Sequence, residues 1–281
     1  MSLMPTHTSR PGSSPQLELS MSAIWSRMRA EATEASREEP ILSSFLNAAV
    51  LRHENFTDAL AYRLAAKLAD AQLDAMLARD VAEAAIKGDP GIVACAAADI
   101  IAVEERDPAC IGYLQPFLYF KGYHALQAHR VAHWLWVEGR HTLAFHIQSR
   151  VSERFGVDIH PAAQMGHGVM IDHATSIVIG ATAVVRNDVS LLHEVTLGGT
   201  GAADEDRHPK IGEGVLIGAG AKVLGNIEIG DRARIAAGSV VLKPVPAGCT
   251  VAGVPAKIVG DCCPEPAQSM DQVLPDIDYS I

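Results

Sequence analysis

The sequence lacks an excess of positive charge. Lysine and arginine total 23 against 33 aspartates and glutamates, which gives a net charge of −10, and no local basic patch offsets it. Nucleic acids and anionic membranes repel a surface of this kind. The composition therefore argues against nucleic-acid binding and against binding at a membrane surface.

Long apolar runs are also missing. No stretch approaches the roughly 20 residues that cross a bilayer, because Asp99 interrupts the alanine-rich segment 92–102. Residues 1–15 are polar and contain no apolar core like that of a signal peptide, so we expect a disordered leader. These absences predict a cytoplasmic protein without a membrane span.

Cysteines are few, odd in number and without the spacing of a metal site. An adjacent pair makes a poor structural disulfide, and reduced thiols suit the cytosol. Reduced thiols are therefore expected at all five positions, which are Cys95, Cys110, Cys249, Cys262 and Cys263.

Residues 16–155 have the period of an all-α domain. Leu60, Leu64 and Leu68 recur four positions apart, which is the spacing of one helix face. The segment from about Leu118 to Arg154 is expected to form one long helix.

Two kinds of polar residue punctuate the helical domain. Asp89 and Asp107 each precede a proline, a pattern that predicts a helix N-cap. His129 and His133 lie four positions apart and could share a metal ion, with His124 nearby. No third ligand is placed as in a zinc-protease helix, so packing roles are favoured.

From residue 156 to residue 260 an apolar residue recurs at every sixth position. A fixed short period predicts a solenoid, because one short strand cannot bury its apolar face without the next coil. The step from Val195 to Ile211 is sixteen residues, four more than two repeats, and the excess predicts a protruding loop. The thirteen repeat positions are Ile159, Met165, Ile171, Ile177, Ala183, Val189, Val195, Ile211, Ile217, Val223, Ile229, Ile235 and Val241.

Some ionisable residues in the repeats are not needed for stacking. Asp172 and His173 follow the inward Ile171, and adjacent strand residues face opposite sides, so at least one of the pair should point outward. A lone histidine on a solenoid surface is usually only solvated, so this pair by itself leaves a functional and a passive interpretation open. Arg207 and His208 lie in the interrupting loop, and loops on a rigid scaffold commonly carry function.

An ordered set of motifs resembles the serine O-acetyltransferases, a family of hexapeptide-repeat acyltransferases. The resemblance is close over residues 90–260. It implies a left-handed parallel β-helix with three repeats per coil, in which residues eighteen apart stack at about 4.8 Å. The motifs are RDPA (106–109), ALQAHR (125–130), VDIHPAA (157–163), DHAT (172–175), VTLGGTG (195–201), DRHPK (206–210) and AGVPAK (252–257).

The resemblance implies transfer of an acetyl group from acetyl-CoA to the hydroxyl of L-serine, the first step of cysteine biosynthesis. Acetyl-CoA is then a co-substrate, and no permanently bound cofactor or metal is implied. A serine hydroxyl needs a base, and histidine titrates near the working pH. His173 matches the family's base, and Asp158 matches the carboxylate that orients it.

Further site residues follow from the same resemblance. Ala181 stands where relatives often carry glutamate, which leaves open any polar contact made there. Arginine suits a carboxylate because its guanidinium donates two parallel hydrogen bonds. The implied residues are Asp107 and Asp172 for the serine ammonium, Arg207 for its carboxylate, His208 as a second serine-binding group, and Gly198, Gly199, Ala219, Gly220 and Lys257 for CoA.

The spacing of the predicted catalytic pair is informative. Asp158 lies fifteen residues before His173, three short of one coil. That offset separates the two side chains by roughly 10 Å along the strand if both belong to one chain. We expect the pair to be completed across a subunit interface, unless the coil corner bends the chain back.

The resemblance also implies trimers that form through the β-helix and that pair into hexamers through the helical domain. It further implies inhibition by cysteine.

Residues 261–281 contain no lysine or arginine and are expected to form a flexible acidic tail. In the resembled family a terminal isoleucine enters the active site of O-acetylserine sulfhydrylase. Ile281 matches that residue, and a carboxylate beside an apolar side chain is a natural capture handle. An inert tail is the alternative.

Three other functions fit part of the pattern. A zinc lyase resembling the γ-class carbonic anhydrases would use His160, His167, His173 or His193 as ligands, but it leaves the polar loop unexplained. An acetyltransferase for a different hydroxyl acceptor keeps the same chemistry. A non-catalytic scaffold protein would leave the Asp172–His173 pair without a role.

Overall fold

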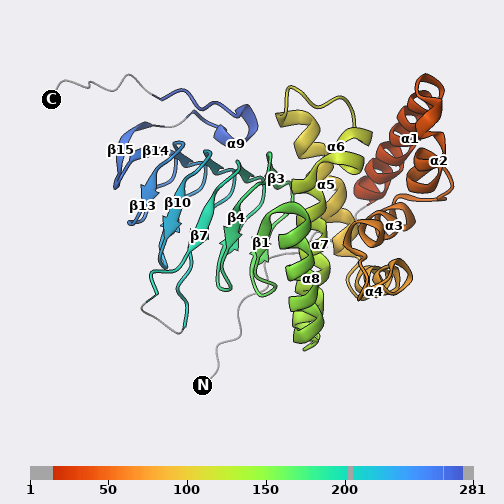
Figure 1. Ribbon diagram of the computed structural model, residues 1–281. Helices are drawn as coiled ribbons and strands as arrows, with labels where there is room; N and C mark the ends of the chain where they lie inside the picture. Colours follow the sequence, from red (N-terminus) through yellow and green to blue (C-terminus); the bar gives the residue numbers. More distant parts are fainter. Residues whose placement is uncertain (1–14, 202–204, 262, 275–281) are drawn as a thin grey trace.

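The computed structural model describes residues 15–201, 205–261 and 263–274. Its N-terminal half is entirely helical and its C-terminal half is a parallel β-solenoid, so the predicted fold class is confirmed (Figure 1). The helical elements are α1 (Pro15–Glu38), η1 (Pro40–Leu42), α2 (Ser43–Leu46), η2 (Asn47–Leu51), α3 (Phe56–Leu68), α4 (Ala75–Gly88), α5 (Gly91–Arg106), α6 (Leu114–Tyr119), α7 (Lys121–Val137) and α8 (His141–Phe155).

Two local predictions for the helical half are wrong. The expected long helix is divided into α7 and α8, because the chain turns at Gly139, whose φ of 73° is a left-handed conformation that glycine adopts readily. Asp107 follows α5 and starts no helix, whereas Asp89 follows α4 and also caps the first turn of α5, as predicted. Asp89 ends α4 and Asp107 ends α5. Each carboxylate accepts a hydrogen bond from the backbone N–H two residues on, at Gly91 and Ala109 respectively.

The histidines of α7 pack as the sequence predicted. The ring of His124 hydrogen-bonds the carbonyl of Phe117 at 2.7 Å, and burial lowers the pKa of His124 to about 3. His129 is buried, and burial holds its pKa well below the usual value. His133 hydrogen-bonds the carbonyl of Pro161 in the first solenoid coil at 2.7 Å. These rings therefore join α7 to its neighbours.

The solenoid is built from short parallel strands that stack into three sheets. In the first sheet the order is β1-β4-β7-β10-β13, in the second β11-β8-β5-β2, and in the third β15-β14-β12-β9-β6-β3. The bounds are β1 (Val157–Ile159), β2 (Gln164–Met165), β3 (Met170–Ile171), β4 (Ile177–Ile179), β5 (Val184–Val185), β6 (Ser190–Leu191), β7 (Thr196–Gly198), β8 (Lys210–Ile211), β9 (Leu216–Ile217), β10 (Lys222–Leu224), β11 (Glu228–Ile229), β12 (Arg234–Ile235), β13 (Val240–Val241), β14 (Cys249–Gly253) and β15 (Ala256–Asp261).

The coils are not all eighteen residues long. Val178 pairs with Thr196, eighteen positions on, as expected, but Asp158 pairs with Val178, twenty positions on. The two extra residues lie in the turn between β3 and β4, which holds His173. Thr196 pairs with Lys222, twenty-six positions on, so the loop between β7 and β8 is eight residues longer than a regular turn. The sequence count of four was wrong, because it subtracted two repeats where only one separates β7 from β8; sixteen residues less one repeat and less the earlier shift of two leave eight.

The first coil has no coil before it, and the helices α7 and α8 cover it instead (Figure 1). Gly122 in α7 approaches so closely that a Cβ atom there would lie 2.0 Å from the carbonyl oxygen of Ile171 in β3. Glycine at this position therefore permits the contact between the helix and the strand that leads to His173.

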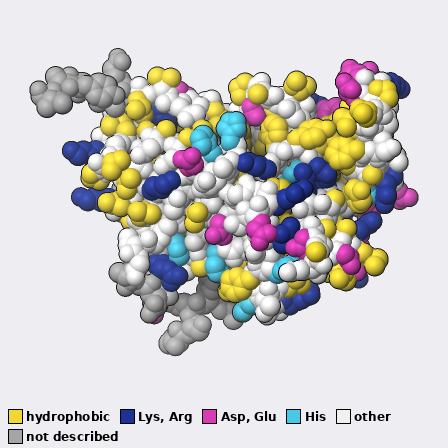
Figure 2. Space-filling model, viewed as in Figure 1, with side chains coloured by type: hydrophobic (Ala, Val, Ile, Leu, Met, Phe, Trp, Pro, Cys, Tyr) yellow, Lys and Arg dark blue, Asp and Glu magenta, His cyan; other side chains and the backbone are white. Residues whose placement is uncertain are grey.

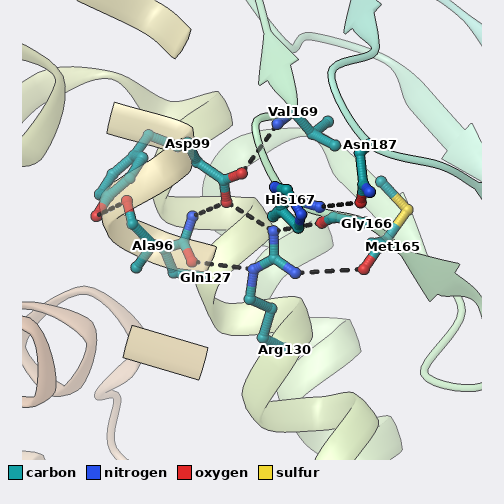
Figure 3. Close-up of polar contacts among 10 residues, drawn as sticks. Ala96, Asp99, Gln127, Arg130, Met165, Gly166, His167, Val169 and Asn187 are labelled. Atoms are coloured by element: carbon teal, nitrogen blue, oxygen red, sulfur yellow. Dashed lines mark hydrogen bonds and ion pairs between the residues drawn. The ribbon is translucent and has the colours of Figure 1, made fainter. Parts of the chain in front are cut away.

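A buried polar network locks this junction (Figure 3). The Asp99 carboxylate in α5 is fully buried and accepts hydrogen bonds from Arg130 at 2.7 Å, Gln127 at 2.9 Å and the backbone N–H of Val169 at 2.9 Å. Arg130 also donates to the carbonyl of Gly166 at 2.8 Å. Burial lowers the pKa of the Arg130 guanidinium, but the charge and hydrogen bond of Asp99 together with Cys95 and Tyr123 more than offset this and raise it.

The C-terminal segment folds back along the third sheet (Figure 1). After the antiparallel hairpin of β14 and β15, helix α9 (Pro266–Ser269) contacts α5. The buried Arg106 donates to Gln268 at 3.3 Å, and the buried Arg234 donates to the carbonyl of Asp271 at 3.0 Å. Part of the predicted flexible tail is thus held by two arginines, while Ile281 lies outside the described residues.

Two further observations concern the chain as a whole. Within the described ranges no helix is long and apolar enough to span a membrane. No disulfide forms among the described cysteines, which are Cys95, Cys110, Cys249 and Cys263.

Candidate active site

His173 lies on the lengthened turn between β3 and β4. It adopts a left-handed conformation with a φ of 54°, as do Ala174 at 60° and Ser176 at 63°. Residues other than glycine rarely adopt a backbone conformation with positive φ. At His173 this conformation directs the imidazole away from the coil. The ring is 73% exposed, and its Nε2 lies 3.6 Å from the Asp172 carboxylate. The sequence correctly expected an outward side chain in this pair.

Asp107 and Asp172 meet beside this turn. Burial raises the pKa of the Asp172 carboxyl, the His173 ring opposes that shift, and the negative charge of Asp107 adds to it. The two carboxylates therefore interact electrostatically, although Asp107 directly follows α5 and Asp172 directly follows β3. Such a pair favours a bound cation, because a cation relieves the repulsion.

His193 is a member of this group that sequence reasoning set aside. Its ring packs edge-on against that of His173, with centroids 5.7 Å apart and planes inclined by 73°. Its charge also acts on Asp172. The signal was weak, because His193 follows His173 by twenty residues, and only the twenty-residue first coil brings the two rings into register.

Successive turns stack beneath His173 along one corner of the solenoid. The N–H of Glu194 donates to the carbonyl of Thr175 at 2.7 Å, that of Gly220 donates to His193 at 2.9 Å, and that of Gly238 donates to Ala219 at 2.7 Å. Ala219 and Gly220, predicted to bind CoA, therefore lie on the same corner as His173, two coils further along. The small residues Ala219, Gly220 and Gly238 on the further turns leave the backbone open to a long ligand.

Asp158 does not contact His173 within one chain. It lies in the middle of β1, where its Oδ1 accepts a hydrogen bond from Gln148 of α8 at 2.6 Å. Because the first coil holds twenty residues, Asp158 stacks on Val178, five positions after His173. No hydrogen bond or ion pair between the two side chains occurs in the described part of the chain.

His160, Arg207 and His208 form a second group, at the corner where the chain passes from the first sheet to the second. The His160 ring packs on Trp136 and Phe145, with centroids 5.1 and 5.6 Å away. Burial lowers its pKa, Asp158 opposes this, and the charge of Arg207 adds to the lowering. Asp158 therefore lies nearer to this corner than its pairing with His173 suggested. Figure 2 shows histidine side chains at the surface in separate places, some in the upper part of the view and others in the lower part.

His208 is only 6% exposed, and Thr182 holds it in place. The Thr182 N–H donates to His208 Nδ1 at 3.2 Å, and the Thr182 hydroxyl lies 2.8 Å from the same nitrogen. Burial lowers the pKa of His208, and the charges of Arg207 and Lys210 lower it further. Its imidazole is thus kept neutral, with Nδ1 as an acceptor. Sequence reasoning missed Thr182, because nothing marks it apart from its place after Gly180 and Ala181.

The remaining predicted CoA residues lie apart from one another. Gly198 ends β7, and a Cβ atom at Gly199 would lie 3.2 Å from the Arg207 side chain, so glycine makes room for the arginine. Lys257 lies in β15, opposite Ala252 in the terminal hairpin. Within the described ranges no three His, Cys, Asp or Glu side chains are placed to hold a metal ion.

Comparison with known proteins is consistent with these features. Residues 24–128 match the family "Serine acetyltransferase, N-terminal", and residues 208–243 match "Bacterial transferase hexapeptide (six repeats)". The serine acetyltransferase of Escherichia coli K12 is 55% identical over 258 residues, which are 92% of this chain and 94% of that protein.

Two solved structures are also similar. The serine acetyltransferase of Brucella abortus in complex with coenzyme A has a TM-score of 0.85 and 50% identity, covering 86% of this chain and 96% of that chain. The Neisseria gonorrhoeae enzyme in complex with serine has a TM-score of 0.81 and 53% identity, covering 83% and 96% respectively. This chain belongs to the serine acetyltransferase family.

Proposed function

We propose that this protein transfers the acetyl group of acetyl-CoA to the side-chain hydroxyl of L-serine, giving O-acetylserine and CoA. The proteins named serine acetyltransferase are similar to this chain over nearly its whole length, and solved structures of two of them hold serine or coenzyme A. The observation that carries the proposal for this chain is the exposed His173, which lies beside two carboxylates at the head of a corner lined with small residues.

His173 acts as the general base. Its imidazole removes the proton from the serine Oγ as this oxygen attacks the thioester carbon, so that a C–O bond forms and a tetrahedral intermediate arises. The intermediate collapses with cleavage of the C–S bond, and the imidazolium returns the proton to the departing thiolate. No protein nucleophile is needed, because both substrates are bound together.

Charge complementarity orients the serine. Asp107 and Asp172 receive the ammonium group, which relieves the repulsion between the two carboxylates. Arg207 binds the serine carboxylate through two parallel hydrogen bonds, and His208 supports it. A buried, neutral His208 suits this role, because it provides a directed hydrogen bond without a second positive charge.

These groups lie at two different corners of one chain. The three-residue strand β4, about 10 Å long, separates the turn of His173 from the corner of Arg207 and His208. We infer that the site closes between neighbouring subunits of a trimer, where Asp158 of one chain orients His173 of the next. Pairing of trimers through the helical domain is the corresponding proposal for a hexamer.

CoA follows the corner of stacked turns. Ala219 and Gly220 lie two coils from His173, so a pantetheine arm running along this corner would bring its thioester to the imidazole. Gly198 and Gly199 are proposed to border the thioester end, and Lys257 to meet a phosphate of CoA.

Thiol release from acetyl-CoA, measured across serine, other hydroxy amino acids and simple amino alcohols, tests the reaction and its acceptor. We expect His173→Ala to lose at least a hundredfold in kcat, the usual contribution of a general base. His146→Ala, in α8 outside both groups, is the matched control and should remain active. Undiminished activity of His173→Ala would refute the mechanism, and tightly bound zinc together with CO2 hydration would favour the lyase alternative.

The partner proposal concerns the C-terminus. Deletion of Ile281 should abolish binding of O-acetylserine sulfhydrylase and leave acetyl transfer unchanged. Unaltered binding by the shortened chain would show that the acidic tail has no such role.

A further inference from the structure

One hydroxyl group outside the loop between β7 and β8 binds two consecutive backbone N–H groups at the end of that loop. The Thr182 Oγ1, in the turn between β4 and β5, accepts hydrogen bonds from the backbone N–H groups of Arg207 and His208, each at 3.1 Å. The same oxygen lies 2.8 Å from His208 Nδ1. The hydroxyl also interacts with the Asp206 carboxylate. All of these partners belong to the segment 206–208, which includes Arg207 and His208, the two residues proposed to bind the serine carboxylate.

Thr182 also determines which nitrogen of His208 carries the proton. Its backbone N–H donates to Nδ1 at 3.2 Å, so Nδ1 is an acceptor and the neutral ring is protonated at Nε2. The carbonyl of Thr182 in addition accepts a hydrogen bond from Lys210 Nζ at 2.9 Å. Backbone and side chain of one residue thus fix both ends of the segment 207–210.

Gly180 supplies the space that this arrangement needs. A Cβ atom at position 180 would lie 2.0 Å from both Cδ2 and Nε2 of His208, so the ring lies directly against the glycine backbone. The histidine is therefore held between Gly180 on one side and Thr182 on the other. A ring confined in this way has one orientation, and that orientation depends on the hydroxyl.

We propose that Thr182 is a positioning residue for serine, acting through Arg207 and His208. The inference rests on the proposed function, because it assigns those two residues to serine. Without the hydroxyl, two backbone N–H groups lose their acceptor and the loop is free to shift, which misplaces the guanidinium. CoA follows the other corner and meets this loop only through the proposed contacts at Gly198 and Gly199, so its binding depends less on the loop position than the binding of serine does.

Thr182→Val removes the hydroxyl, preserves the shape and keeps the backbone N–H, while Thr182→Ser restores the hydroxyl. For Thr182→Val we expect the KM for serine to rise about tenfold or more, the factor that one or two hydrogen bonds to a charged or buried group contribute. The KM for acetyl-CoA should change less than about twofold, and Thr182→Ser should return the KM for serine to within about threefold of wild type.

A merely structural role would give a different pattern. Equal rises in both KM values together with a lower melting temperature would overturn the inference, as would an unchanged KM for serine in Thr182→Val. The double variant Thr182→Val/His208→Gln should be scarcely worse than the poorer single variant, because both act on one loop. Additive losses would contradict this.

The proposed function fails in a distinguishable way. If the wild-type protein releases no thiol with serine, or if His173→Ala stays active, the assigned reaction is wrong whatever Thr182 does. If wild type is active, His173→Ala is inactive and Thr182→Val behaves as wild type, only the role of Thr182 is refuted.

Discussion

Removal of the Asp99 carboxylate should destabilise the junction between the helices and the solenoid severely. In Asp99→Ala the buried Arg130 loses the partner that lies 2.7 Å away, and Gln127 and the Val169 N–H lose their acceptor. Breaking a buried ion pair from one side costs about 3–5 kcal/mol, chiefly because a charge stays buried and uncompensated. We therefore expect a loss of about 4 kcal/mol, since the unsatisfied neutral donors overlap with this value and do not simply add to it.

Urea unfolding followed by tryptophan fluorescence measures this loss. With a slope of about 3 kcal/mol per molar urea, 4 kcal/mol corresponds to a fall of roughly 1.3 M in the midpoint. The control is Asp99→Leu/Arg130→Met, in which neither charge remains. Its destabilisation should be about 2 kcal/mol smaller than the sum of the two single variants, because the pair is directly coupled. A loss below about 1 kcal/mol in Asp99→Ala, or strict additivity, would refute the argument.

Three further outcomes are expected. Gly122→Ala should lower the unfolding midpoint and kcat together, because the new methyl group meets the backbone of Ile171; an unchanged midpoint would show that α7 can move away. Asp107→Asn should lower the pKa of Asp172, since it removes a like charge that raises that pKa, so the Asp172 carboxyl signal in an NMR titration should move to lower pH. Burial raises the pKa of Cys110 to about 11, so its alkylation at pH 8, followed by mass spectrometry, should be slower than that of a model thiol.

The solenoid could be predicted from its period, but the exact register could not. Each side of a coil has two inward positions that lie two residues apart, as Ile177 and Ile179 illustrate, and both are buried. If the chain gains two residues, a count of every sixth residue therefore moves from one buried position to the other buried position of the same strand. The insertion beside His173 escaped notice because every later apolar residue still fell on an inward position. The loop after β7 appeared shorter than it is, because its length was compared with two repeats instead of one.

The candidate site was predictable to a different degree for each part. Asp172 and His173 are adjacent in sequence, and the motif identified them; the approach of Asp107 from α5 could not be derived from spacing, because it depends on helix packing. Whether Asp158 and His173 pair across subunits stays a prediction. Thr182 and Asp99 gave little sign of their roles. Asp99 did interrupt an apolar run, and a lone carboxylate in such a run indicates a buried partner.

The lengthened turn has a consequence for how reactive sites arise in repeating folds. The repeat gains two residues at the turn that holds His173, and the six-residue spacing then continues. The pattern of buried residues does not reveal this insertion. The corner that holds the proposed catalytic base thus differs from a corner that merely closes a coil by two residues, while the inward positions stay apolar. In such a fold a centre of reaction can be gained, lost or moved to another coil while the scaffold stays intact, and counting repeats alone would never reveal it.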